Sequence, residues 1–145
     1  MEALREVYRQ LVQGLDFDGP DTLLRNVSAE QAVAKLPGWP YSIGTNVAHA
    51  DHWQKIWLAR LTGARAPKTF PDFPEVEPAE WEHVRRSFLL NLAQAQEIAS
   101  AETFSHKMRD DATARKLLLQ IALHNAYHLG QIKLLKRLLR ASKQS

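Results

Sequence analysis

The chain has 145 residues, a formal net charge of +3 and no cysteine. Without cysteine it cannot form disulfides, bind a metal through thiolates or use a cysteine nucleophile. This length suits a single core, so we expect one domain over residues 1–145. The first residues lack the apolar segment of a signal peptide, and no apolar run is long enough to span a bilayer. We therefore expect a cytoplasmic protein that does not enter a membrane.

Helical periodicity dominates the chain, and no segment alternates with period two for long enough to predict a sheet. A first helix that ends near Gly14 is predicted by apolar residues at spacings of three and four, namely Leu4, Val7, Leu11 and Leu15. A short helical turn follows, with Ser28 as its N-cap, and ends at Pro37. Ser42 is then a suitable N-cap for a second long helix that runs to about Gly63.

Residues 63–78 contain four prolines, which exclude a helix there and predict a long crossover. Pro78 suits the first turn of a third helix, whose apolar residues stay in register to Ala99. After a connection near 102–110, Asp111 is placed to cap a fourth helix that reaches about Leu139. Four long helices with one long connection favour an all-α four-helix bundle with the crossover between helices two and three.

The strongest chemical signal is the pair His124 and His128, which lie one helical turn apart on one face of the fourth helix. They interrupt an aliphatic seam formed by Leu117, Ile121, Ile132, Leu135 and Leu139. An unsatisfied buried imidazole nitrogen costs about 1–3 kcal/mol, so the pair needs a shared explanation. Two explanations are possible: the histidines are hydrogen-bonded residues of the core, or they share a metal ion. We favour the metal. Asn125 replaces the glutamate of His-Glu-x-x-His metalloproteases, which excludes that chemistry.

A third ligand must come from another helix, and the second helix offers His49 and His52. The core direction of that helix is defined by Ile43, Val47, Ala50, Trp57 and Leu61. His49 lies at the edge of this face and is the better candidate, whereas His52 points closer to the opposite side and is the reserve. His83 and His106 have no partner at ligand spacing, and we expect both at the surface.

Two further patterns bear on partners. The fourth helix carries a second apolar strip, formed by Leu119, Leu123, Tyr127, Gly130, Leu134 and Leu138. This strip predicts contact either with a third helix of the bundle or with a second copy of the chain, and we favour a homodimer. The basic residues after 132 complement the macrodipole of a helix C-terminus and are not interleaved with aromatic residues, so we do not expect nucleic-acid binding.

Two blocks of sequence, Ser-Ile-Gly-Thr-Asn-Val-Ala-His at 42–49 and His-Asn-Ala-Tyr-His-Leu-Gly-Gln-Ile at 124–132, resemble the DinB-like (DinB/YfiT) superfamily of metal-binding four-helix bundles. The resemblance covers nearly the whole chain and implies an up-down-down-up bundle, frequent dimers and a divalent metal. It implies that the metal ligands are His49, His124 and His128. Members include thiol transferases and a thiol-dependent isomerase, beside many without a known activity. Tyr41 stands where the family has tryptophan, so the pocket mouth is expected to differ.

Three neutral imidazoles would leave a coordination position open, as catalytic zinc sites do. Zn²⁺ or Ni²⁺ suits nitrogen ligands, and Fe²⁺ or Mn²⁺ is the alternative. We expect a metal-dependent thiol transferase, or a hydrolase, in which the metal lowers the pKa of a bound low-molecular-weight thiol or water. Asn46 and Tyr127 are candidates for orienting the substrate, and no carboxylate base is expected because Asp51 faces elsewhere. The alternative function is a non-catalytic bundle with a structural or ligand-sensing metal site.

Overall fold

The computed structural model describes residues 1–144, and all regular elements in that range are helical. In chain order they are α1 (Glu2–Gln13), α2 (Pro20–Arg25), α3 (Ala29–Val33), α4 (Ile43–Thr62), the 3₁₀ turn η1 (Pro78–Glu80), α5 (Trp81–Ser100) and α6 (Asp111–Gln144). The predicted all-α class is therefore confirmed. The four long helices that were predicted correspond to α1, α4, α5 and α6.

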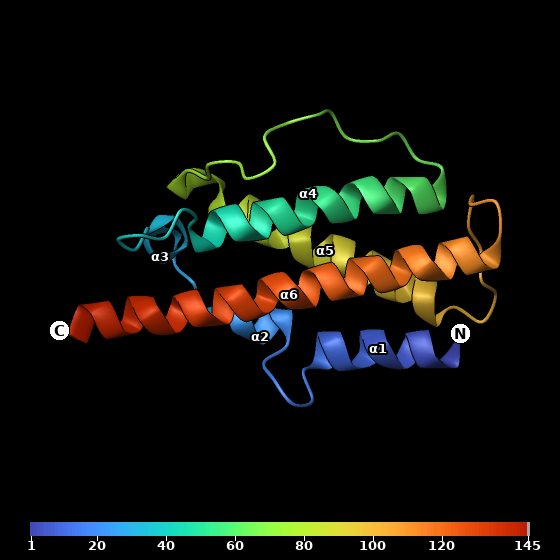
Figure 1. Cartoon of the computed structure of the whole chain (residues 1–145), viewed down its shortest axis with the longest axis horizontal. Coiled ribbons are helices and arrows are strands. Elements are labelled where there is room, and N and C mark those ends of the chain that lie inside the picture. Colours follow the sequence, from blue (N-terminus) through green and yellow to red (C-terminus); the bar gives the residue numbers. More distant parts are fainter. Residues whose placement is uncertain (145) are drawn as a thin grey trace.

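The long helices lie side by side and differ in direction (Figure 1). In that view α1 runs from right to left, α4 and α5 both run from left to right, and α6 returns to the left. The connection 63–77 passes back along α4, so α5 begins at the end where α4 began. α4 packs against both α5 and α6, and α1 packs against the same two helices. The proline-rich segment thus connects two helices of the same direction, as a long crossover must.

The positions at which α4 and α6 begin are set by side chains that accept hydrogen bonds from the first N–H groups of each helix. Ser42 caps α4, because its hydroxyl oxygen accepts a hydrogen bond from the N–H of Thr45 at 3.0 Å. At the start of α6 the cap is Asp110, whose carboxylate accepts from the N–H of Thr113 at 2.7 Å. Asp111 is the first residue inside the helix, so its predicted role as the cap was wrong by one position.

The N-terminal part differs from the sequence prediction in two ways. The helix α2 was not predicted, although Pro20 occupies a first-turn position that proline favours. In α1 Tyr8 is fully buried together with the predicted Leu4 and Leu11, whereas Val7 is 37% exposed and Leu15, beyond the end of the helix, is 55% exposed. The Tyr8 hydroxyl donates to the carbonyl oxygen of Leu118 in α6 at 2.7 Å, which satisfies the polar group of a buried tyrosine.

The helix α6 is the longest element, with 34 residues, and it continues beyond the predicted end near Leu139. The aliphatic residues predicted to form its core seam are buried, namely Leu117, Ile121, Ile132, Leu135 and Leu139. None of the helices in the described range combines the length and the apolar character that crossing a membrane requires.

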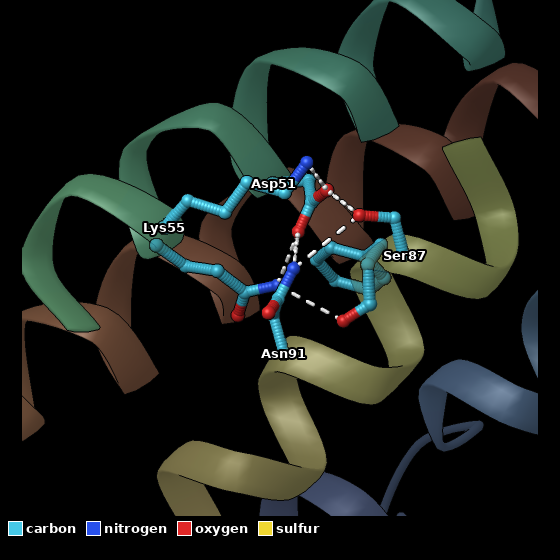
Figure 2. Close-up of polar contacts among 6 residues, drawn as sticks. Asp51, Lys55, Ser87 and Asn91 are labelled. Atoms are coloured by element: carbon cyan, nitrogen blue, oxygen red, sulfur yellow. Dashed lines mark hydrogen bonds and ion pairs between the residues drawn. The ribbon is translucent and has the colours of Figure 1, made fainter. Parts of the chain in front are cut away.

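A buried carboxylate holds α4 against α5 (Figure 2). The Asp51 side chain lies among polar groups of α5 and accepts hydrogen bonds from the Ser87 hydroxyl at 2.6 Å and the Asn91 amide at 3.0 Å. Lys55, one turn further along α4, lies 3.1 Å from the same carboxylate. Asp51 therefore belongs to the interface between α4 and α5, and its partners account for a charged group that is only 3% exposed.

The polar layer continues from α5 to α6 through Gln54, which is fully buried. Its amide nitrogen donates to Asp51 and to the carbonyl oxygen of Phe88, both at 2.9 Å. Its amide oxygen accepts from Asn125 of α6, also at 2.9 Å. One glutamine thus links three helices, which restricts how they can slide past one another and supports the register that positions the site described next.

Candidate metal centre

Three histidines from two helices form a compact group in the protein interior. His49 comes from α4, and His124 and His128 come from α6. One ring nitrogen of each lies within 4.8 Å of the others, and the ring centroids are 4.5 to 5.3 Å apart. Within residues 1–144, no other set of three or more histidine, aspartate or glutamate side chains is so arranged. A group of this kind can hold a metal ion.

Hydrogen bonds place the ring proton of two of the histidines on Nδ1. Nδ1 of His49 donates to the backbone carbonyl oxygen of Asp72 at 2.7 Å, and Nδ1 of His128 donates to the side-chain oxygen of Gln131 at 2.8 Å. Because an oxygen acceptor requires the proton on Nδ1, Nε2 of each ring keeps its lone pair. An acceptor on the far nitrogen is the usual arrangement around a metal-binding histidine.

The third ring, His124, is not satisfied by hydrogen bonds. Its Nε2 lies 3.2 Å from Nε2 of His128. Its Nδ1 is buried and has no hydrogen-bond partner among the described residues. The contact between the two Nε2 atoms therefore satisfies one nitrogen of the ring, while the other nitrogen has no partner in the described part of the chain. Three imidazoles that converge without enough acceptors form a donor set suited to a divalent cation.

The environment also favours the form of histidine that binds metals. Burial, followed by repulsion from the neighbouring histidine charges, lowers the pKa of His124 from 6.5 to about 4. Burial and the nearby His49 lower the pKa of His128 to about 4 in the same way. Both rings are therefore neutral at physiological pH, and neutral imidazole is the state that coordinates a metal.

Aromatic rings cover His49 on the side of the crossover. The ring of Phe73 stacks on His49 with a centroid distance of 4.0 Å and an interplanar angle of 3°. Tyr41 stacks on Phe73 at 4.2 Å and 8°, so the three rings form one parallel column. Tyr41, where the family resemblance led us to expect tryptophan, is the outermost ring of this column.

On the opposite helix, His124 borders a surface hollow of about 770 Å³. The hollow lies between α4 and α6, and its lining is mainly apolar, with Trp53, Trp57, Leu119, Leu123 and Tyr127. Trp57 approaches His124 edge-on at a centroid distance of 5.1 Å. Of the described residues that line the hollow, Lys116 is the only one with a charged side chain, because His124 is neutral. One side of the histidine group is thus accessible from an open, aromatic-rich surface.

The two residues predicted to orient a substrate lie in different surroundings. Asn46 is 5% exposed, and its amide donates to the carbonyl oxygen of Ser42 at 2.9 Å, within the first turn of α4. Tyr127 is 65% exposed, lines the hollow and approaches His128 edge-on with a centroid distance of 5.2 Å. Of the two, Tyr127 is the residue with direct access to the hollow.

The other histidines lie outside the group. His52, the reserve candidate, is buried against Phe70 with ring centroids 3.4 Å apart. His83 is exposed on α5, as predicted. The prediction for His106 was wrong: its side chain is only 8% exposed and its Nε2 lies 2.7 Å from the Asp111 carboxylate.

A carboxylate that the sequence analysis did not consider lies beside one of the three histidines. Asp72, in the crossover, places a carboxylate oxygen 3.2 Å from Nδ1 of His49 and accepts a hydrogen bond from the indole of Trp53 at 2.7 Å. No periodicity or motif marks an aspartate in a proline-rich connection, although connections often carry functional residues. Gln131 was part of the family block but had been given no role.

The sequence pattern of the DinB superfamily matches residues 1–132, and the chain belongs to this superfamily. The resemblance inferred from the two blocks is therefore confirmed. Comparisons with curated proteins and with solved structures give no match.

Proposed function

We propose that this protein is a divalent-metal-dependent enzyme of the DinB superfamily that transfers a low-molecular-weight thiol to an electrophilic substrate. The observation that carries the proposal is a group of three converging histidines, two of them buried and one half-buried, beside an apolar hollow that is open to solvent. A metal held by three protein ligands has a position left for a small molecule, which is typical of catalytic rather than structural zinc sites.

In this proposal His49, His124 and His128 hold the ion through their Nε2 atoms. The ion, for which we propose Zn²⁺ or Ni²⁺, with Fe²⁺ or Mn²⁺ as the alternative, would lower the pKa of a thiol or water at the remaining position. The apolar lining of the hollow suits an apolar electrophile, and Tyr127, which belongs to that lining, would contact it. A carbon–sulfur bond would then form: with an aryl halide the carbon–halogen bond breaks, halide leaves and the thiol proton passes to solvent, whereas with an activated alkene the π bond breaks and the second carbon takes up a proton.

The alternative is a non-catalytic protein in which the metal is structural or senses a ligand. It is supported by the position of the group, which would join α4 to α6. A structural metal should be required for the fold, whereas an enzyme should keep its fold when the metal is removed and lose only its activity.

The first experiment measures the metal content of protein purified without a histidine tag, for the unaltered chain and for His124→Ala. We expect about one divalent ion per chain, lost in the variant. The loaded protein is then incubated with a panel of thiols and an activated aryl halide or alkene, and the thioether product is quantified. Metal-dependent product supports the enzyme. Unfolding when the metal is removed, together with no product from the metal-loaded chain with any thiol, supports the structural alternative. Absence of bound metal after Zn²⁺ and Ni²⁺ are supplied would refute both.

We also assign the chain to the up-down-down-up type of four-helix bundle. The support is the directions of the long helices, with α4 and α5 running in the same sense and α1 and α6 in the opposite one (Figure 1). In this arrangement a crossover is required between the second and third long helices, and residues 63–77 supply it.

A homodimer through α6 is the last part of the proposal, and because Leu119, Leu123 and Tyr127 also line the hollow, the second copy would border the substrate site. The second apolar strip of α6 is not covered within the chain, since Leu119, Leu123, Tyr127 and Leu134 are 40%, 68%, 65% and 46% exposed. Large exposed apolar patches often mark interaction surfaces, and a strip along one helix can pack against its own copy about a twofold axis. Light scattering should give twice the 16.5 kDa chain mass, and Leu123→Glu should return it to one chain while its metal content stays unchanged. A single-chain mass for the unaltered protein at all concentrations would refute the dimer.

A further inference from the structure

The crossover supplies a residue that acts on the metal centre without belonging to it. We propose that Asp72 is a positioning residue: its carbonyl holds His49 in the tautomer and orientation that present Nε2 to the metal, and its carboxylate, bound by Trp53, keeps that carbonyl in place. This inference rests on the proposed function, because it concerns how the same three-histidine group is prepared for its ion.

The contact between Asp72 and His49 determines which nitrogen can coordinate. The Asp72 carbonyl accepts from Nδ1 of His49 at 2.7 Å, and one oxygen of its carboxylate lies 3.2 Å from the same nitrogen. A carbonyl oxygen cannot donate, so the ring proton must be on Nδ1. Without this acceptor the neutral ring would also populate the tautomer with the proton on Nε2, which cannot bind a metal at that atom.

The second contact explains why a carbonyl in a connection without regular structure has a defined place. The indole N–H of Trp53 donates to the Asp72 carboxylate at 2.7 Å. Trp53 follows His49 by four residues in α4, so the two side chains lie on the same helical face, one turn apart. Asp72 therefore bridges two neighbouring side chains of one helix, the first through its backbone and the second through its side chain.

The next residue of the crossover adds to the same constraint. Phe73 stacks on the face of His49, and Tyr41 stacks on Phe73. The His49 ring is thus restrained at its edge by Asp72 and on its face by Phe73. Acceptors of this kind around metal-binding histidines typically contribute a factor of about 10–100 to metal affinity.

Positioning can be separated from an effect of charge. The Asp72 side chain is 57% exposed, so its negative charge is screened by solvent and should act weakly on the ion. Asp72→Asn keeps an oxygen that can accept from Trp53 but removes the charge. Asp72→Ala removes both, and Trp53→Phe removes the donor while keeping an aromatic ring. Asp16→Ala, at an exposed aspartate between α1 and α2, is the matched control.

The test measures the Zn²⁺ dissociation constant of each metal-free chain by competition with a chelator. We expect Asp72→Ala to weaken binding by about 10–100-fold, with about one ion per chain at saturation. Asp72→Asn should stay within about fivefold of the unaltered chain because the lost charge is screened. Trp53→Phe should weaken binding in the same direction and add little to Asp72→Ala, since both act through one contact. Unchanged affinity in Asp72→Ala, or equal losses in Asp72→Asn and Asp72→Ala, would overturn the proposal.

A spectroscopic measurement makes the test independent of metal binding. Nitrogen NMR of the metal-free protein should show the His49 proton on Nδ1, and Asp72→Ala should shift the ring toward the other tautomer. The same tautomer distribution in both chains would also overturn the positioning role. Failure of the unaltered chain to bind metal would instead refute the proposed function, so the two failures are distinguishable.

Discussion

Metal binding should raise the thermal stability of this protein by an amount that can be calculated. The three ligands come from α4 and α6, which only the folded chain brings together, so the ion should bind the folded state far better than the unfolded one. Such a ligand stabilises by RT ln(1 + [L]/Kd), which is about 2.7 kcal/mol at a free concentration of 100 times Kd. With an unfolding entropy of about 2.1 cal/mol/K per residue, a 145-residue chain should melt about 9 °C higher.

The assay is differential scanning calorimetry of tag-free, chelator-treated protein, with and without Zn²⁺ at 100 times the Kd determined by competition. His49→Ala, His124→Ala and His128→Ala should each lose most of the shift, because each removes one of three ligands. His83→Ala, at an exposed position on α5, is the matched control and should keep the shift.

A second control separates the two histidines of α4. His52 lies outside the group, so His52→Ala should keep the metal-induced shift even if its own melting temperature falls. A full shift in His49→Ala would refute the ligand assignment. Stoichiometric binding to the unaltered chain without any rise in melting temperature would refute the argument that the folded state forms the site.

Three further outcomes follow from the buried polar groups. Asp51→Ala should lower the free energy of unfolding in urea by about 3 kcal/mol, because several buried donors lose a charged acceptor. The metal-free protein should lose stability in thermal melts as pH falls from 6.5 toward 4, because the pKa values of His124 and His128 are lowered to about 4 and the unfolded chain takes up protons first. Tyr8→Phe should cost about 1–1.5 kcal/mol, measured in urea, because it removes the hydrogen bond to Leu118.

Control variants and contradicting outcomes can be stated for these predictions. Asp16→Ala and Tyr127→Phe alter exposed residues of the same types and should change stability by less than about 0.5 kcal/mol. A loss below about 1 kcal/mol for Asp51→Ala would mean that water replaces the carboxylate in this network. Constant stability of the metal-free protein between pH 6.5 and 4 would contradict the depressed pKa values of the two histidines.

Features that depend on neighbours within one or two turns were predictable. The apolar spacings, the prolines and the cap at Ser42 located the four long helices, because helix periodicity and capping are local properties. The pair His124 and His128 was recognisable for the same reason, since a spacing of four residues in a helix places two side chains together whatever the rest of the fold does. The core position of Tyr8 was missed because its hydroxyl finds a partner only in α6, far away in sequence.

Packing between helices determined which surfaces are exposed and which side chains meet, and the local sequence pattern could not decide either. The second strip of α6 was compatible with an interior contact or a surface, and the arrangement of α1, α4 and α5 leaves it exposed. The convergence of His49 with the pair on α6 likewise depends on how α4 lies against α6, which the helical wheel alone suggested but could not establish.

The contacts made by the crossover are the clearest example of structure that the sequence did not predict. Its prolines predicted only that residues 63–77 would not be helical. That Asp72 accepts from His49 and Trp53, and that Phe73 stacks on the His49 ring, follows from the path of the chain back along α4. Helices and their histidine spacing arise from interactions a few residues apart, whereas the partners of those histidines depend on contacts that only the packed molecule can form.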